Sequence, residues 1–214
     1  MLYNPPHFRE TDRAVLDDFI ATAAFATLVT AGADGPIVSH LPMLLDAVPA
    51  PGGSLIGHVA RANPQWRASD LDRPALAIFM GPQAYVSPSW YPSKAAHGKV
   101  VPTWNYAAVH VTGRLSTFDE PDALRALVDR LTATHEATFA SPWRTTDAPD
   151  DFIRAQLKAI VGVRLEIAGV EGKMKLSQNR TQEDRAGVVD GLERRHEPAA
   201  AALAAMMRTA PPRP

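Results

Sequence analysis

The order of its β-rich and helical runs constrains this chain most. After one amphipathic run, strand-like runs rich in Val, Ile, Leu and Thr follow one another from residue 25 to residue 118. Parallel strands need a long crossover between them, whereas antiparallel strands need only short turns. We therefore expect an α+β fold with a mainly antiparallel sheet of six or seven strands. Closing it into a small barrel would remove exposed strand edges.

Turn signals divide the first half of the chain. The amphipathic run preceded by Thr11 predicts a helix that ends near residue 23. The runs FATLVTA and IVSHLPMLL flank the turn signal 33–35, which predicts a hairpin, and Pro42 should then lie at a strand edge or bulge. A third strand, SLIGHVA, ends before Asn63, which we expect to cap a short helix that begins at Pro64.

The second half reads as long strands and helices. Gly81-Pro82 predicts a turn, residues 87–102 an irregular loop, and residues 104–118 one long strand, followed by a helix with Asp119 as its N-cap. Another helix, a strand over 159–173 and two more helices complete the chain. We expect a single domain over 1–214, with a helical C-terminal extension from about residue 181.

Composition narrows the function classes. The 214 residues are 46% hydrophobic, which suffices for one substantial core, and the net charge of −1 gives no global field for nucleic acid. The absence of cysteine excludes disulfides and thiolate metal sites. The N-terminus has no apolar signal region, and no run is long enough to span a membrane, so we expect a cytoplasmic protein.

The sequence lacks the motifs that mark several classes of enzyme. No pair of histidines stands at metal-binding spacing on a helix, and the chain has no G-x-S-x-G, no G-x-G-x-x-G after a strand and no P-loop. We therefore predict no metal site and leave the catalytic residues unknown. Single strand histidines such as His40 and His58 are more often structural residues than ligands or bases.

Aromatic residues with a polar atom gather between residues 85 and 106. They are Tyr85, Trp90, Tyr91, Trp104 and Tyr106, and no Phe lies among them. Such rings suit a partly wet apolar surface, because a buried indole N–H or phenol O–H must find a partner. A dimer interface or loop anchor and a contact with a flat cofactor are equally good interpretations, and both can hold together.

Two segments could hold an anion. Residues 171–180 follow a strand directly and contain three cations, a hydroxyl and two amides, although strand ends with solvated charges are common. Residues 57–63 end a strand and open a helix, so Arg61 and backbone N–H groups could meet a phosphate there. An arginine at a strand end is nevertheless more often a surface residue.

Six segments together resemble the PaiB family of FMN-binding negative transcriptional regulators. They are YNPPHF at 3–8, SHLP at 39–42, GHVARANPQW at 57–66, GPQAYVSPSWYPSK at 81–94, VPTWNY at 101–106 and EGKMKLSQNR at 171–180. The resemblance implies a homodimer of six-stranded split barrels, similar to pyridoxamine-phosphate oxidases, with peripheral helices and with FMN between the two protomers.

The resemblance also implies cofactor-binding residues. The first set lies on two strands and the turn after them: Ser39, His40, Leu41, Pro42, His58, Val59, Ala60, Arg61 and Asn63. Trp104 and Asn105 correspond to positions near the ring that come from the neighbouring subunit. The last set lies in the anion-binding stretch: Lys173, Lys175, Ser177 and Gln178. Residues 38–43 lack the basic side chains that hold phosphate in the oxidases, so this role shifts to Arg61 and the C-terminal lysines.

Two functions follow from the resemblance. The first is a negative transcriptional regulator that binds FMN and has promoter DNA as a possible partner. The alternative is an FMN-dependent oxidoreductase, a flavin reductase or a pyridoxamine-phosphate-oxidase-like enzyme, in the same pocket. FMN supplies the redox chemistry, so the protein needs only to position substrate and tune the ring. His40, His58 or Tyr106 could donate to a flavin atom or substrate.

Overall fold

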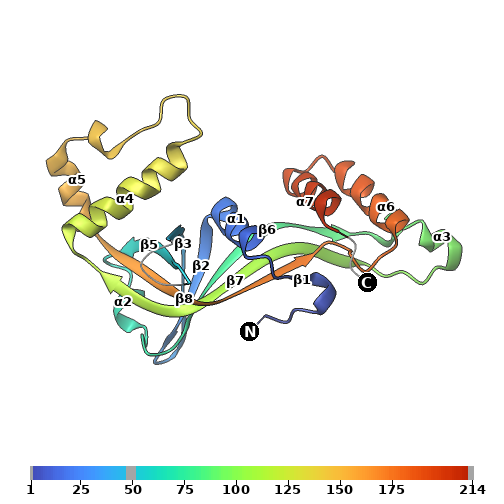
Figure 1. Ribbon diagram of the computed structural model, residues 1–214, viewed down its shortest axis with the longest axis horizontal. Helices are drawn as coiled ribbons and strands as arrows, with labels where there is room; N and C mark the ends of the chain where they lie inside the picture. The colour runs from blue at the N-terminus through green and yellow to red at the C-terminus, as the bar shows by residue number, and fades with distance from the viewer. Residues whose placement is uncertain (1, 47–51, 212–214) are drawn as a thin grey trace. The chain divides into compact units, whose positions relative to one another are not determined.

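The computed structural model describes residues 2–46 and 52–211 (Figure 1). The chain divides into two compact units, each built from segments far apart in the sequence. Unit 1 comprises Met1–Phe19, Met80–Val109 and Glu171–Pro214, and unit 2 comprises Ile20–Phe79 and His110–Val170. Each unit is described by itself below.

The strands form one sheet in the order β3-β2-β6-β7-β8-β5-β4, and β1 pairs with β8. Every pair whose register is resolved is antiparallel, which confirms the expected fold class. The described residues hold eight strands, two more than a six-stranded barrel. The strands are β1 Arg9–Glu10, β2 Phe25–Gly32, β3 Gly35–Pro42, β4 Leu44–Asp46, β5 Ser54–Ala60, β6 Ala75–Val86, β7 Thr103–Phe118 and β8 Ile160–Lys175.

Seven α-helices and three 3-10 turns accompany the sheet in the described residues. The α-helices are α1 Arg13–Ala23, α2 Gln65–Ala68, α3 Ser93–His97, α4 Pro121–Glu136, α5 Asp150–Leu157, α6 Gln182–Glu193 and α7 Pro198–Thr209. The 3-10 turns are η1 Pro6–Phe8, η2 Pro88–Trp90 and η3 Thr145–Asp147. None of the helices within 2–46 and 52–211 has the length and apolar character needed to cross a membrane.

In unit 2 the first hairpin confirms the turn prediction. Gly32 pairs with Gly35, so the connection has only two residues, and Gly35 adopts a φ of 133° that favours glycine. The sheet then curls, and the close contact between β5 and the end of β3 shows this. A Cβ at Gly57 of β5 would lie 2.7 Å from the Pro42 carbonyl oxygen. Strands that are not neighbours in the sheet order therefore approach one another across its concave side.

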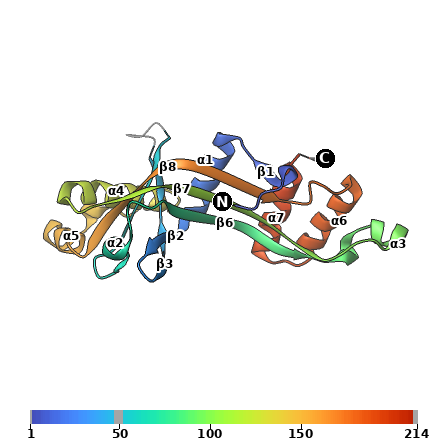
Figure 2. The ribbon, with the colours of Figure 1, turned by 90° about the horizontal axis from the view of Figure 1, so that it is seen from below.

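Two helices of unit 2, α4 and α5, pack against its strands. Apolar positions along α4 face the sheet, since Leu127 and Leu131 pack with Ile56 of β5. Leu124 of the same helix packs instead with Ile153 and with a further leucine of α5. Figure 2 shows α4 and α5 lying side by side in this unit, consistent with those contacts.

In unit 1 the segment after β6 is fastened to α6. A Cβ at Gly191 would lie 2.2 Å from the Trp90 ring, so the indole packs directly on the helix backbone. The Asp184 carboxylate of α6 accepts hydrogen bonds from the Ser93 backbone N–H and hydroxyl at 3.1 and 2.8 Å. This fixes the start of α3 and agrees with the loop-anchoring interpretation of Trp90. The expected loop 87–102 therefore contains two short helical turns.

The turn predicted at Gly81-Pro82 was wrong, because β6 runs unbroken from Ala75 to Val86. A Cβ at position 81 would lie 2.6 Å from the Phe19 ring of α1. The glycine is therefore explained by the close approach of a helix, and it marks no change of chain direction.

Other boundaries also differ from the predictions. The run IVSHLPMLL is broken at Met43, whose backbone N–H donates to the Ala24 carbonyl at 2.8 Å, so β3 and β4 are separate strands. Asp119 does not cap α4, because its carboxylate pairs with Arg61 at 3.2 Å and α4 begins with Pro121.

Candidate functional site

The sequence-predicted cofactor residues fall into two groups in different units. Unit 2 holds Ser39, His40, Leu41, Pro42, His58, Val59, Ala60, Arg61 and Asn63. Unit 1 holds Trp104, Asn105, Lys173, Lys175, Ser177 and Gln178. We consider the hydrogen bonds and burial of each group in turn.

Ser39 and Asn63 contact each other in unit 2. The Asn63 side-chain N–H donates to the Ser39 hydroxyl at 2.8 Å, and its amide oxygen accepts from the Gln65 backbone N–H at 2.9 Å. The prediction that Asn63 caps a helix beginning at Pro64 was wrong in its boundaries, because α2 begins at Gln65 and Pro64 is its N-cap residue, so Asn63 lies one residue before the cap. Both side chains are thus partnered within the unit.

The two strand histidines have different surroundings. His40 is exposed on β3, where its Nδ1 lies 3.0 Å from the Thr27 hydroxyl and its ring stacks on Phe25. His58 on β5 is partly buried, and its Nδ1 has no hydrogen-bond partner among the described residues. Burial lowers the pKa of His58, so its imidazole is neutral at pH 7. Its neighbour Val59 is buried in the core.

The Arg61 guanidinium is occupied by unit 2 itself. Its Nε donates to the Lys158 carbonyl at 2.8 Å, and its Nη2 donates to the Ile160 carbonyl at 3.1 Å. Its Nη1 pairs with Asp119 at 3.2 Å. Holding a phosphate would require some of these bonds to break, so the geometry favours a structural role. The phosphate role of Arg61 stays a prediction.

In unit 1 a cavity of about 180 Å³ is lined by four segments of the chain, three of which contribute polar side chains. We call this cavity the cradle. It is lined by Phe8, Tyr91, Thr103, Asn105, Lys175, Ser177, Asn179 and Arg180. Each of the four segments belongs to one of the sequence motifs that carry the family resemblance.

The cradle floor is held by a buried hydrogen bond between two strand ends. The Asn105 side-chain N–H donates to the Ser177 hydroxyl at 2.8 Å, and both residues are buried. Ser177 has a φ of 61°, which turns the chain sharply after β8. Gln178 stabilises this turn, since its side-chain oxygen accepts from the Leu176 N–H at 2.8 Å. Gln178 thus shapes the cradle without lining it.

Cations dominate one side of the cradle. The Lys175 ammonium donates to the Thr103 hydroxyl at 2.5 Å and to the Trp104 carbonyl at 2.8 Å. Burial lowers the pKa of Lys175, and the positive charges of Lys173 and Arg180 lower it further. No carboxylate within the described residues forms an ion pair with any of these three cations. The cradle therefore favours an anion.

Tyr91 and Arg180 contact each other in the lining of the cradle. The Arg180 guanidinium carbon lies 5.3 Å from the centre of the Tyr91 ring. Burial raises the pKa of Tyr91 although the Arg180 charge opposes the rise, so the phenol is protonated at pH 7. The pair offers a phenol O–H and guanidinium N–H groups to a bound molecule.

Trp104 lies outside the cavity on an exposed surface. Its ring meets Tyr85 edge to face at 6.4 Å, and about half of each side chain is exposed. The Trp104 indole N–H donates to the Gln83 side chain at 3.2 Å. Its backbone carbonyl accepts from Lys175, which places this aromatic surface next to the cradle.

Sequence reasoning found part of the cradle. Lys175, Ser177 and Asn105 line it, whereas Lys173 reaches away to the Tyr3 carbonyl at 2.7 Å. The other lining residues, Phe8, Tyr91, Thr103, Asn179 and Arg180, were not among the predicted cofactor residues. The sequence did contain a signal for Asn179 and Arg180, because both lie in the cation-rich run 171–180. No group of three or more His, Asp or Glu residues in the described ranges could hold a metal ion.

The comparisons with known proteins identify a family and a fold. The family described as "Putative FMN-binding domain" matches residues 2–169, a range that ends before the cradle residues between 175 and 180. The protease synthase and sporulation protein PAI 2 of Bacillus subtilis is 32% identical over 206 residues, 96% of each chain.

Two solved structures share the fold. The FAD- and haem-binding protein of Mycobacterium smegmatis has a TM-score of 0.58 at 21% identity, covering 83% of this chain and 78% of that one. A conserved hypothetical protein of Mycobacterium tuberculosis has a TM-score of 0.57 at 14% identity, covering 85% and 95%. The chain is an FMN-binding split-barrel protein and belongs to the FMN-binding family named above. Its cofactor is a flavin.

The donor set of the cradle fits the phosphate of such a flavin. The cradle contains an ammonium, a guanidinium and three hydroxyls, which are groups that can donate hydrogen bonds to phosphate oxygens. The Asn105 side-chain oxygen is buried without a hydrogen-bond partner among the described residues, so the cradle can also accept one hydrogen bond. Bound there, FMN would supply electron transfer from its ring.

Proposed function

We propose that this chain is a homodimeric FMN-binding protein of the PaiB type that holds the FMN phosphate in the cradle and acts as a negative regulator of transcription. The observation that carries the cofactor site is the partly buried ammonium of Lys175, which lines the same cavity as Arg180 and has no carboxylate partner in the described residues. Like charges at close range disfavour the folded state, and a dianionic phosphate reverses that cost.

The exposed aromatic surface is a candidate binding place for the isoalloxazine ring of FMN. Trp104 and Tyr85 expose large apolar faces beside the cradle, and an isoalloxazine ring or a partner chain would cover them. The Trp104 backbone carbonyl bonds to Lys175, so a molecule with its phosphate on Lys175 has this surface within reach.

Titration of FMN into ligand-free protein tests the site, with binding followed by quenching of flavin fluorescence. We expect saturable binding by the wild type and about tenfold weaker binding by Lys175→Gln, because one charge-assisted hydrogen bond is lost. Lys99→Gln is the matched control, since Lys99 is exposed in the same unit and does not line the cradle. Equal FMN affinity of all three proteins would place the phosphate elsewhere.

An apolar sheet face of unit 2 supports the homodimer. Val29 of β2 pairs with Val38 of β3 on one side and with Leu76 of β6 on the other. Val38 is half exposed, and Phe25, four register pairs away on the same face, has more than half of its side chain exposed. Apolar patches of this kind on a sheet face mark interfaces.

Light scattering during size exclusion tests the dimer. We expect a mass of twice 23.1 kDa for the wild type, and Val38→Lys should shift the protein toward the monomer because it buries a charge in the interface. Lys99→Gln should leave the mass unchanged. A monomeric wild type at micromolar concentration would defeat the homodimer.

The regulatory role is supported by the full-length similarity to PAI 2, whose name associates it with protease synthesis and sporulation. The described helices do not offer an obvious basic recognition surface, since α6 carries Glu183, Asp184, Asp190 and Glu193. Mobility-shift assays with promoter fragments should show retardation that weakens steeply with salt. No retardation at low salt would defeat direct regulation and leave an indirect route.

An FMN-dependent oxidoreductase is the second candidate. It is favoured by two proton-carrying groups in one cavity, the Lys175 ammonium with its lowered pKa and the Tyr91 phenol with its raised pKa. FMN-loaded protein that consumes NAD(P)H, with a rate reduced in Tyr91→Phe at unchanged FMN affinity, would support the enzyme. FMN-loaded protein inert toward NAD(P)H would remove a flavin reductase.

A further inference from the structure

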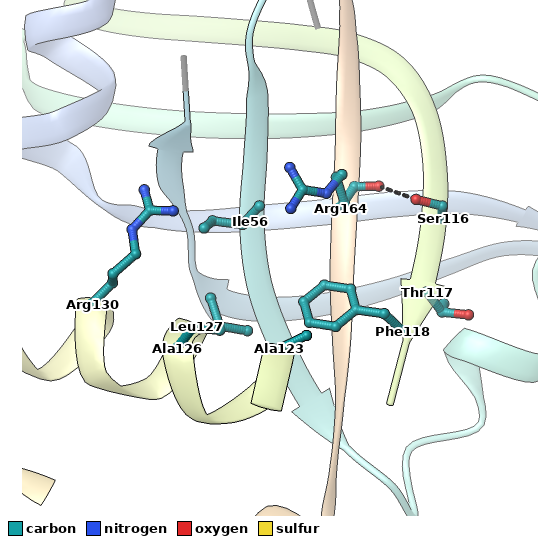
Figure 3. Close-up of a pocket in the computed structure, with 9 residues that line it drawn as sticks. All are labelled: Ile56, Ser116, Thr117, Phe118, Ala123, Ala126, Leu127, Arg130 and Arg164. Carbon is teal, nitrogen blue, oxygen red and sulfur yellow. Dashed lines mark hydrogen bonds between the residues drawn. The ribbon is translucent and has the colours of Figure 1, made fainter. Parts of the chain in front are cut away.

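Unit 2 contains a groove that none of the predicted cofactor residues lines. It lies between α4 and the strands β5, β7 and β8, and Figure 3 shows its side chains. Its volume is about 380 Å³, within the range of roughly 300–1,000 Å³ that small-molecule sites occupy. The lining residues are Ile56, Ser116, Thr117, Phe118, Ala123, Ala126, Leu127, Arg130 and Arg164.

The floor and the rim of the groove differ in chemistry. Ile56, Phe118 and Leu127 supply an apolar floor, and these three belong to one packed cluster. The guanidinium groups of Arg130 and Arg164 stand at one end in Figure 3. The groove therefore combines an apolar bed with a cationic end, which suits a molecule with an apolar body and an anionic group.

The two arginines share one carboxylate. Asp46 of β4 lies 3.3 Å from Nη1 of Arg130 and 3.3 Å from Nη1 of Arg164, and its own side chain is mostly buried. Two guanidinium charges against one carboxylate leave one net positive charge in this cluster. A bound monoanion would balance it.

Arg164 keeps donors available for that anion. Its Nη1 donates to Asp46 at 3.3 Å and to the Ser54 hydroxyl at 3.0 Å, and the described residues accept no hydrogen bond from its Nη2 or Nε. A guanidinium edge with two parallel N–H groups matches a carboxylate in geometry. Arg130 adds a second charge from α4, with its side chain about half exposed.

We propose that this groove binds a small monocarboxylate with an apolar body about the size of one aromatic ring. The carboxylate pairs with Arg164 and Arg130 beside Asp46, and the apolar body lies on Ile56, Phe118 and Leu127. The site is separate from the cradle, because all its lining residues belong to unit 2 and the cradle belongs to unit 1.

A solely structural role for the ion cluster makes a different prediction. If Asp46 served only to tie α4 and β8 to β4, its replacement would lower stability and create no ligand effect. If the groove binds carboxylates, Asp46 competes with the ligand for both guanidinium groups. Asp46→Asn should then strengthen binding, because it leaves two cations without their shared carboxylate.

Isothermal titration of the full-length protein with phenylacetate, and with phenylacetamide as the uncharged probe of the same shape, tests the site. We expect saturable binding of phenylacetate and at least about tenfold weaker binding of the amide, because the amide lacks the charge that the arginines recognise. Arg130→Gln and Ala126→Trp should each weaken phenylacetate binding by about tenfold, the first by removing charge and the second by filling the groove.

Arg154→Gln is the matched control, since Arg154 is an exposed arginine of the same unit that pairs with Asp150 and does not line the groove. It should leave phenylacetate affinity unchanged, and thermal unfolding should show every variant folded. Three results would overturn the proposal: no phenylacetate binding at about 5 mM, equal binding of the amide, or unchanged affinity in folded Asp46→Asn and Ala126→Trp.

Discussion

The Asn105 side-chain amide donates a hydrogen bond to the Ser177 hydroxyl across 2.8 Å, although 72 residues separate the two in the chain. Asn105 lies near the start of β7 and Ser177 just after the end of β8, so this bond joins the two ends that form the cradle. Both residues are buried, and hydrogen bonds between buried groups are costly to leave unmade.

Replacing Asn105 with alanine should therefore destabilise the protein. We expect Asn105→Ala to lower the free energy of unfolding by about 1–3 kcal/mol, because it leaves the Ser177 hydroxyl without this donor and opens a small cavity. Urea denaturation followed by tryptophan fluorescence measures the change, with Lys99→Gln as the exposed control. A variant as stable as the wild type would show that this bond contributes little.

The affinity for FMN should fall as the pH rises above neutrality. Burial and the charges of Lys173 and Arg180 lower the pKa of Lys175 in the free protein, and a bound phosphate dianion raises that pKa again. Binding then requires the protonated lysine, so the FMN dissociation constant should increase once the pH passes the lowered pKa. Titrations between pH 7 and 10 measure this increase, and Lys175→Gln should lose it.

The lowered pKa of Lys175 also predicts the direction in which the stability of the ligand-free protein changes with pH. Between the lowered pKa of folded Lys175 and the ordinary lysine pKa, the unfolded chain binds a proton that the folded chain lacks. The contribution of Lys175 to the free energy of unfolding therefore rises with pH across that interval and is constant below it. Comparing the wild type with Lys175→Gln isolates this contribution, and a fall with pH in the difference would contradict the account.

Replacing Arg61 should lower the stability of the protein and leave its affinity for FMN unchanged. Arg61→Gln removes the pair with Asp119 and the bonds to the carbonyls of Lys158 and Ile160, which should cost about 1–3 kcal/mol of unfolding free energy. Its FMN affinity should match that of the wild type in fluorescence titrations. A loss of FMN affinity by about tenfold with normal stability would instead place the phosphate at Arg61.

Gly191 should not tolerate a methyl group. A Cβ at this position would lie 2.2 Å from the Trp90 ring, so Gly191→Ala must push the indole away from α6 and should cost about 1–3 kcal/mol. Gln182→Ala is the control at an exposed position of the same helix. Urea denaturation decides the matter, since equal stability of the two variants would mean that the indole moves without cost.

Local patterns predicted the elements of this fold well. Apolar periodicity located α1, and the turn signal 33–35 located the hairpin of β2 and β3. These features depend on residues close together in the sequence, so the spacing of those residues predicts them. The turn predicted at Gly81-Pro82 failed because glycine there serves the approach of Phe19, which is distant in sequence.

The candidate site was predicted less completely because it depends on long-range contacts. The cation-rich run 171–180 pointed to an anion site, and Lys175 and Ser177 do line the cradle. Nothing in the spacing shows that Arg61 donates to carbonyls about 100 residues away, or that Lys173 turns toward Tyr3. The partners of a cation decide whether it is available to a ligand, and they are visible only in the folded chain.

The affinity of Arg180→Gln for FMN and for riboflavin tests the central claim most directly, because riboflavin has the same ring system without the phosphate. The wild type should bind FMN more tightly than riboflavin. Arg180→Gln should weaken FMN binding by about tenfold and leave riboflavin binding unchanged, since only the phosphate contacts the cradle in this account. An unchanged ratio of the two affinities in this variant would contradict a phosphate site at Lys175 and Arg180.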